Sequence, residues 1–277
     1  MTAIVLAAVS ALVWGTADFS GGKASQRAQP LTVTVISQLL CLPTLAICLL
    51  VVPGTPSGPD LAWGVGAGIA GFGGLVLFYR ALASGAMAVV APITAVTAAL
   101  VPIVIGLLTD RAPGALALGG AALAVLAIAL VSLGPGGDRR AVTAGLVGVA
   151  LLAGALFGLF FALLGQSTEE AGMWPLAAGR AASIALGLLM LARAGGVPRL
   201  PRPALAWAAV AGTLDVVANG LYLAAAVRGH LSIVAAVAAL YPASTVLLAL
   251  AVDRERLRVL QIAGLGLAAT ALVLTTT

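Results

Sequence analysis

The chain has 277 residues, of which 62 % are hydrophobic and only 8 % are charged. About 25 % of the residues of an ordinary soluble domain are charged, so this composition excludes a water-soluble globular protein and predicts an all-α integral membrane protein. The net charge of +5 does not indicate a nucleic-acid partner, because the basic residues are spread over many loops and form no cluster.

Ten stretches of about twenty uncharged, mostly apolar residues follow one another, and each is long enough to cross the ~30 Å hydrocarbon core of a bilayer. Segments rich in proline and glycine separate several of them. We interpret the first stretch as a retained helix because no basic residue precedes it and no small-residue cleavage site follows it. The predicted spans are residues 3–22, 31–52, 61–82, 87–108, 114–134, 141–164, 173–193, 204–226, 231–252 and 257–276.

The first two spans carry polar and aromatic side chains. Trp14 and Asp18 are four residues apart and therefore share one helical face, and Gln38 lies within the second span. An ionisable group within a span costs about 2.5–3.5 kcal/mol on insertion scales, so it is expected to face the bundle interior. The alternatives are an interfacial Asp18, a membrane-belt Trp14 and a Gln38 that only packs.

The seventh and eighth spans hold the strongest candidates for a binding site. Asp215 lies about twelve residues into the eighth span, near the bilayer midplane, and Asn219 and Tyr222 follow it on the same face. A carboxylate desolvated at that depth is suited to bind and release a proton. Arg180 is positioned to pair with Asp215, Asp18 or an anionic substrate. The alternative is that Asp215 is a neutral, hydrogen-bonded packing residue.

Three prolines are candidate hinges. Proline removes a backbone donor and frees a carbonyl one turn earlier, which can bind a ligand or permit bending. Pro92 and Pro102 lie in the fourth span, and Tyr241-Pro242 lies in the middle of the ninth, which makes Tyr241 a further site candidate. A simple kink is the alternative at each position.

The sequence repeats at a displacement of 144 residues. Residues 61–63 (LAW) fall on residues 205–207 (LAW), and after a slip of one residue Asp110-Arg111 meets Asp253-Arg254. Five spans in each copy require the second copy to enter the membrane from the opposite side, as in transporters built from inverted repeats. We therefore predict two inverted five-helix halves, residues 1–137 and 138–277.

The basic residues are unequally divided between the two sets of loops. The loops after the even-numbered spans hold Arg111 and Arg228, whereas the loops after the odd-numbered spans hold the larger set of basic residues given below. The positive-inside rule therefore predicts that both termini lie away from the cytoplasm. The basic residues of the predicted cytoplasmic set are Lys23, Arg27, Arg80, Arg139, Arg140, Arg193, Arg199, Arg202, Arg254, Arg256 and Arg258.

Three stretches carry a family resemblance: residues 11–15 (ALVWG), residues 77–93 (LFYRALASGAMAVVAPI), and residues 240–242 (LYP) followed by residues 253–255 (DRE). With them the chain resembles the EamA-type members of the drug/metabolite transporter superfamily. The resemblance covers nearly the whole chain and implies a ten-helix carrier of small metabolites, with a leaning towards export. Phe157-Gly158 stands where the second half would repeat Trp14-Gly15.

These features predict a multi-pass secondary transporter of small organic metabolites or drugs in the plasma membrane, working by alternating access as a monomer or homodimer. We expect no enzymatic activity, because His230 is the single histidine and no paired catalytic motif accompanies it. We expect no cofactor, metal or nucleic-acid partner, and the sequence has no ATP-binding P-loop. A channel and a lipid or polyprenyl-carrier flippase are the alternatives, of which the flippase is the closer.

Overall fold

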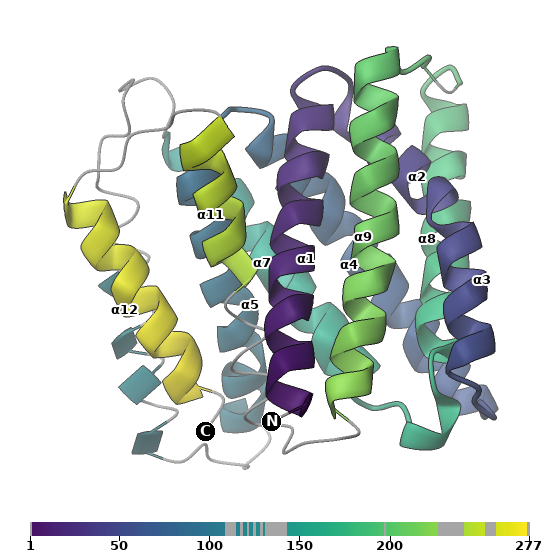
Figure 1. Ribbon diagram of the computed structural model, residues 1–277, viewed down its shortest axis with the longest axis horizontal. Helices are drawn as coiled ribbons and strands as arrows, with labels where there is room; N and C mark the ends of the chain where they lie inside the picture. The colour runs from purple at the N-terminus through teal and green to yellow at the C-terminus, as the bar shows by residue number, and fades with distance from the viewer. Residues whose placement is uncertain are drawn as a thin grey trace.

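The computed structural model describes residues 2–108, 143–196, 198–226, 241–252 and 259–275, with short stretches between 115 and 130. Within these residues the structure is helical and contains no strand, which confirms the all-α prediction (Figure 1). The helices are α1 (Thr2–Ser25), α2 (Pro30–Leu40), α3 (Leu42–Val51), α4 (Gly58–Leu82), α5 (Met87–Leu108), α7 (Ala144–Leu164), α8 (Trp174–Arg193), α9 (Arg202–Ala226), α11 (Tyr241–Val252) and α12 (Val259–Thr275), with the short 3-10 helix η1 (Glu169–Ala171) before α8.

The helices match the predicted spans closely wherever both can be compared. Helices α1, α4, α7, α8 and α9 are each long and apolar enough to cross a membrane, and the bent pair α2 and α3 makes a sixth such unit. Their outer faces carry exposed apolar side chains such as Leu12, Leu50 and Val259, as lipid-facing surfaces do. Most of the predicted fifth span and residues 231–240 of the ninth lie outside the described residues.

The second predicted span is not one straight helix. It is divided at Cys41 into α2 and α3, which meet at a bend of 40°. Pro43 explains the break, because its nitrogen cannot donate to the carbonyl of Leu39 and its ring crowds that carbonyl. The bend turns α3 away from the line of α2, so the predicted span over residues 31–52 consists of two helices rather than one.

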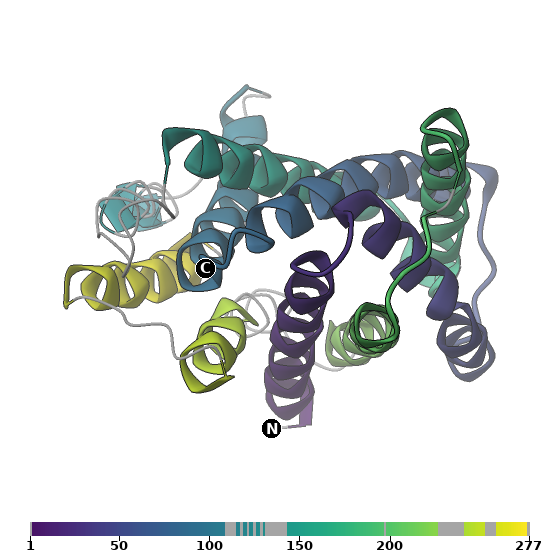
Figure 2. The ribbon, with the colours of Figure 1, turned by 90° about the horizontal axis from the view of Figure 1, so that it is seen from above.

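Helices that are distant in sequence pack side by side. Helix α1 lies between α9 and α11, and α4 packs against both α7 and α8 (Figures 1 and 2). Helix α7 also packs against α5, and α2 packs against α8 and α9. Helix α2 also packs against α1, so it brings α1, α8 and α9 together.

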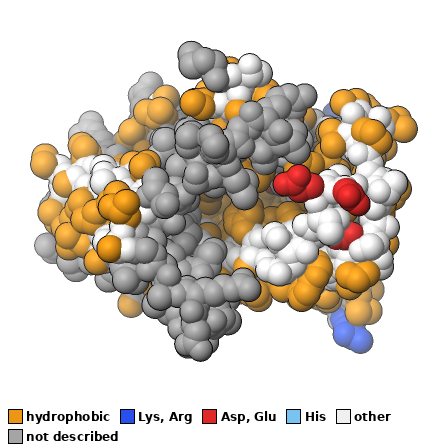
Figure 3. Space-filling model, turned by 90° about the horizontal axis from the view of Figure 1, so that it is seen from below, with side chains coloured by type: hydrophobic (Ala, Val, Ile, Leu, Met, Phe, Trp, Pro, Cys, Tyr) orange, Lys and Arg blue, Asp and Glu red, His pale blue; other side chains and the backbone are white. Residues whose placement is uncertain are grey.

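The two ends of the bundle differ in charge. The chain termini lie at the same end (Figure 1), and acidic side chains gather on the face seen from that end (Figure 3). Glu169 and Glu170 belong to η1, in the connection between α7 and α8 at this end. The opposite end carries basic residues: Arg27 and Arg199 in the loops, with Lys23, Arg80, Arg193 and Arg202 at the adjoining helix ends.

At the acidic end Asp60 fastens two loops together. Ser57 is the N-cap of α4, and Asp60 completes its capping box by accepting hydrogen bonds from the backbone N–H and the hydroxyl of Ser57, at 2.8 and 2.5 Å. It also accepts hydrogen bonds from the backbone N–H and the hydroxyl of Thr168, at 2.7 and 3.2 Å. A backbone bond of 2.8 Å from Thr55 to the carbonyl of Glu170 runs beside it. One carboxylate therefore joins the start of α4 to the loop that precedes α8.

We expect Asp60→Ala to lower the apparent melting temperature in detergent by several degrees. The substitution removes the carboxylate half of the capping box and the two hydrogen bonds that Asp60 accepts from Thr168, and leaves the Ser57 cap and the Thr55–Glu170 backbone bond in place. Glu170→Ala is the control, because it removes an exposed carboxylate from the same loop and keeps the backbone bond to Thr55. Equal melting temperatures for the two variants, measured by intrinsic fluorescence, would contradict the role given to Asp60.

Candidate functional site

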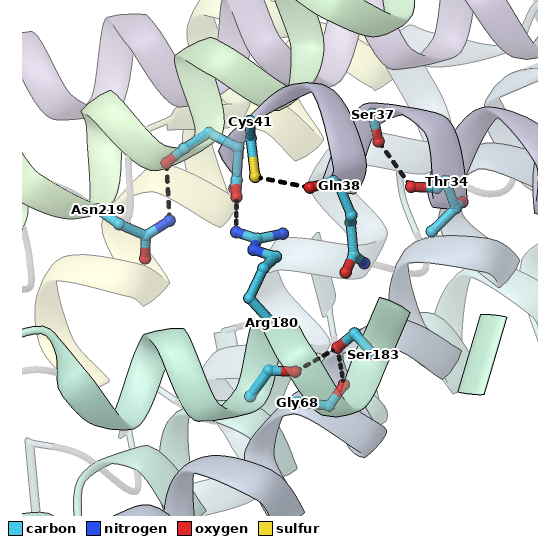
Figure 4. A network of polar contacts seen from close by, with 10 residues as sticks. Thr34, Ser37, Gln38, Cys41, Gly68, Arg180, Ser183 and Asn219 are labelled. Carbon is cyan, nitrogen blue, oxygen red and sulfur yellow. Dashed lines mark hydrogen bonds and ion pairs between the residues drawn. The ribbon is translucent and has the colours of Figure 1, made fainter. Parts of the chain in front are cut away.

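An ion pair crosses the interior of the bundle. Nη2 of Arg180, on α8, donates to Oδ2 of Asp215, on α9, at 2.5 Å. The Arg180 side chain is only 10 % exposed, whereas that of Asp215 is 35 % exposed, so the carboxylate is the more accessible member of the pair. Figure 4 shows the guanidinium of Arg180 reaching between Asn219 on one side and Gln38 on the other. Of the partners considered from sequence, the structure pairs Arg180 with Asp215.

Asp18 lies near this ion pair. Helix α1 continues to Ser25, so Asp18 is almost two turns inside the helix rather than at its end. It is close enough to Asp215 for the two carboxyl groups to interact electrostatically. Asn219 follows Asp215 by one turn, but its side-chain amide donates to the Asp215 carbonyl at 2.7 Å. The predicted polar stripe is thus partly satisfied by its own helix.

Three aromatic side chains form a second group, which we call the aromatic trio: Trp14, Tyr222 and Tyr241. The Trp14 ring lies 5.7 Å from the Tyr222 ring and 6.3 Å from the Tyr241 ring, measured between centroids. The contacts are tilted and edge-on, which are favourable arrangements for aromatic rings. All three residues are partly buried, so the trio forms a wall contributed by α1, α9 and α11.

Two buried polar atoms in the site have no hydrogen-bond partner among the described residues. They are Oε1 of Gln38 and Nε of Arg180. Gln38 is 3 % exposed, and its side chain extends from α2 towards the space beside Arg180 (Figure 4). A buried polar atom left unpaired costs about 1–3 kcal/mol, so this acceptor and this donor are suited to bind a ligand or water.

Tyr79 and Cys41 belong to the site but were not predicted as site residues. Tyr79 is 3 % exposed, its ring lies against Gly21, and it interacts electrostatically with Asp18, Asp215 and Arg180. Cys41 is buried near Arg180, and its thiol donates to the Gln38 carbonyl at 3.1 Å. The rarity of tyrosine was the one sequence signal for Tyr79, because the chain has three tyrosines. In the structure all three lie around this site.

The candidate hinges are less distinctive. Helix α5 runs from Met87 to Leu108 through both Pro92 and Pro102 without a break. Pro242 is the second described residue of α11, and the residues before Tyr241 lie outside the described region. Among the residues that the structure describes, no group of three His, Cys, Asp or Glu is arranged to hold a metal ion.

The comparisons with known proteins give one match. The model of the family described as EamA-like transporter family matches residues 1–133 and 145–277. The comparison with curated proteins gave no match.

Proposed function

The chain belongs to the EamA-like transporter family and is a multi-pass membrane transporter, and on this basis we propose that it moves small organic metabolites or drugs across the plasma membrane by alternating access. The observation that carries the proposal is the Arg180–Asp215 pair, with Asp18 beside it, in the interior of an otherwise apolar bundle. Charged groups at that depth mark a substrate or ion pathway. The direction of transport is proposed to be export.

Close helix contacts support two inverted halves. A Cβ atom at Gly68 on α4 would overlap the backbone of Gly179 on α8, and one at Gly212 on α9 would overlap the backbone of Ser37 on α2. Each contact becomes the other when the two halves are exchanged, because Gly212 lies 144 residues after Gly68 and Gly179 lies 142 residues after Ser37. Both values agree with the displacement of the sequence repeat.

A second pair of contacts obeys the same rule. A Cβ atom at Gly15 would lie 2.5 Å from the carbonyl oxygen of Tyr241, and one at Gly158 would lie 2.7 Å from that of Ala98. The displacement is 143 in both cases, because 158 − 15 and 241 − 98 are equal. Inverted halves with matching contacts favour two arrangements of similar energy, which is what alternating access requires.

The site lies where these halves meet. Helices α1 and α2 contribute Asp18 and Gln38, and α8 and α9 contribute Arg180 and Asp215. The sequence has no P-loop, so we propose that an ion gradient or solute exchange supplies the energy. Proton coupling through Asp215 is part of the proposal. The ionisable groups that surround it are Arg180, Asp18, Tyr79 and Cys41.

The test begins with thermal-shift measurements on the purified protein against amino acids, sugars, nucleosides, quaternary amines and polyprenyl phosphates at two pH values. A stabilising water-soluble solute is then followed by counterflow in proteoliposomes. We expect counterflow that is independent of ATP. Stabilisation by polyprenyl phosphates alone would contradict the metabolite carrier and favour a flippase.

Proton coupling is tested on the same proteoliposomes. We expect an imposed pH gradient to drive net uptake by the unaltered protein and to lose its effect in Asp215→Asn, since an amide cannot release a proton. Glu170→Gln is the control, because it changes an exposed acid far from the ion pair. Transport by Asp215→Asn with unaltered pH dependence would refute coupling through this residue.

A further inference from the structure

We propose that the transported solute is an organic cation, and that its positive group binds between the Asp18 carboxylate and the aromatic trio of Trp14, Tyr222 and Tyr241. This inference rests on the proposed transport function and names the substrate class of the same site. It follows from the charges of the site, from the position of the trio, and from the two unpaired polar atoms.

The charges in the site do not balance. Arg180 is paired with Asp215 at 2.5 Å, so its charge is already compensated. Asp18 has no hydrogen bond or ion pair within the part of the chain that the structure describes, and its charged neighbour is a second carboxyl group. The next cation along α1, Lys23, lies over the ring of Phe19. Two carboxyl groups beside one arginine need one more positive charge, which is either a proton on Asp18 or an organic monocation that displaces it.

The trio is placed to receive that cation. Asp18 follows Trp14 by one helical turn and so shares its face of α1, and Asp18 also interacts electrostatically with Tyr241. Trp14 contacts both tyrosine rings, and all three residues are only partly buried. Aromatic faces attract alkylammonium groups, and tryptophan does so most strongly. A carboxylate beside aromatic walls therefore favours a cation over a neutral or anionic solute.

The unpaired atoms place a second requirement on the solute. Nε of Arg180 is a donor without an acceptor, and Oε1 of Gln38 is an acceptor without a donor. A hydroxyl group of the solute is able to accept a hydrogen bond from Nε of Arg180 or to donate one to Oε1 of Gln38. The inferred solute is thus an organic cation that also carries a hydroxyl or a similar polar group. An anion would instead meet two carboxyl groups and an arginine that is already paired.

Binding to the purified full-length protein tests this inference. The probes are choline and benzyltrimethylammonium, with 3,3-dimethylbutan-1-ol and glycine betaine as the neutral and zwitterionic analogues of choline. We expect calorimetric titration to give both cations at least a ten-fold lower Kd than either analogue. Equal binding of an analogue, or no binding of either cation, would overturn the inference.

Variants locate the bound cation. We expect Asp18→Asn and Trp14→Leu each to raise the Kd of the cations at least ten-fold, with substantial recovery in Trp14→Phe, which keeps an aromatic face. Glu170→Gln should leave the Kd unchanged. Unaltered affinity in both Asp18→Asn and Trp14→Leu, with melting temperatures that show folded proteins, would place the cation elsewhere and overturn the inference.

The two proposals fail in different ways. Counterflow of a neutral or anionic solute, with no binding of either cation, would leave the transport function standing and overturn the substrate class. Binding of the cations at Asp18, with no counterflow of any solute, would support the cation subsite and overturn the transport function.

Discussion

Arg180→Ala is expected to be one of the two most damaging substitutions in this protein. It leaves the Asp215 carboxylate without its cation and places it beside Asp18 in an apolar bundle. Breaking a fully buried pair costs about 3–5 kcal/mol. Because the Asp215 side chain is 35 % exposed, we expect a loss of about 1–3 kcal/mol in the free energy of unfolding. Transport should also be lost.

The double variant Arg180→Gln with Asp215→Asn separates stability from function. It removes both charges while keeping side chains of similar size, so most of the lost stability should return. Transport should remain absent, because the charged site is gone. Denaturant titration of the three proteins gives the comparison. A double variant less stable than Arg180→Ala would show that the pair itself, rather than the unpaired carboxylate, determines stability.

Gly68→Ala and Gly212→Ala form the second prediction, because both add a methyl group where two helix backbones touch. The atoms in the way are backbone atoms of Gly179 and Ser37, which cannot rotate aside as a side chain can. The Ser183 hydroxyl also donates to the Gly68 carbonyl at 2.7 Å, which fixes α8 against α4. Overpacking costs about 1–3 kcal/mol, more than the ~1 kcal/mol of helix propensity that alanine adds. Both variants should be destabilised.

Gly148→Ala is the matched control. Gly148 lies within α7, and a Cβ atom added there would meet nothing within 4 Å. This variant should keep or slightly increase the apparent melting temperature, because only the propensity gain remains. Should Gly68→Ala and Gly212→Ala melt with or above the control, the close contacts between α4 and α8 and between α9 and α2 would be wrong.

Hydropathy predicted the helices well because a bilayer imposes one requirement on every span, about twenty apolar residues. The bend at Cys41 was not predicted, because Pro43 lies within a continuous apolar run. Prolines also lie inside α5, which is unbroken. Proline alone therefore does not distinguish a bent span from a continuous one.

The site was predicted in part for a similar reason. Asp18, Arg180 and Asp215 stand out because charge is rare in a span, so their presence in one place could be anticipated. Tyr79 did not stand out, since a tyrosine at the end of a span is ordinarily an interfacial residue. Its ring turns inwards because Gly21 leaves room for it on α1. That space is created by a neighbouring helix and cannot be inferred from either segment alone.

The packing of α1 constrains how the protein is made. Ser10 donates to the carbonyl of Ala218 at 2.8 Å, a bond between residues 208 positions apart, and Ser244 donates to the carbonyl of Ala11 across 233 positions. Helix α1 therefore meets these two partner helices only after most of the remaining chain has been made. A ribosome-bound fragment that stops after residue 137 would hold α1 without either partner. Biosynthesis of this protein must keep an early, partly polar helix in the bilayer until the last quarter of the chain arrives.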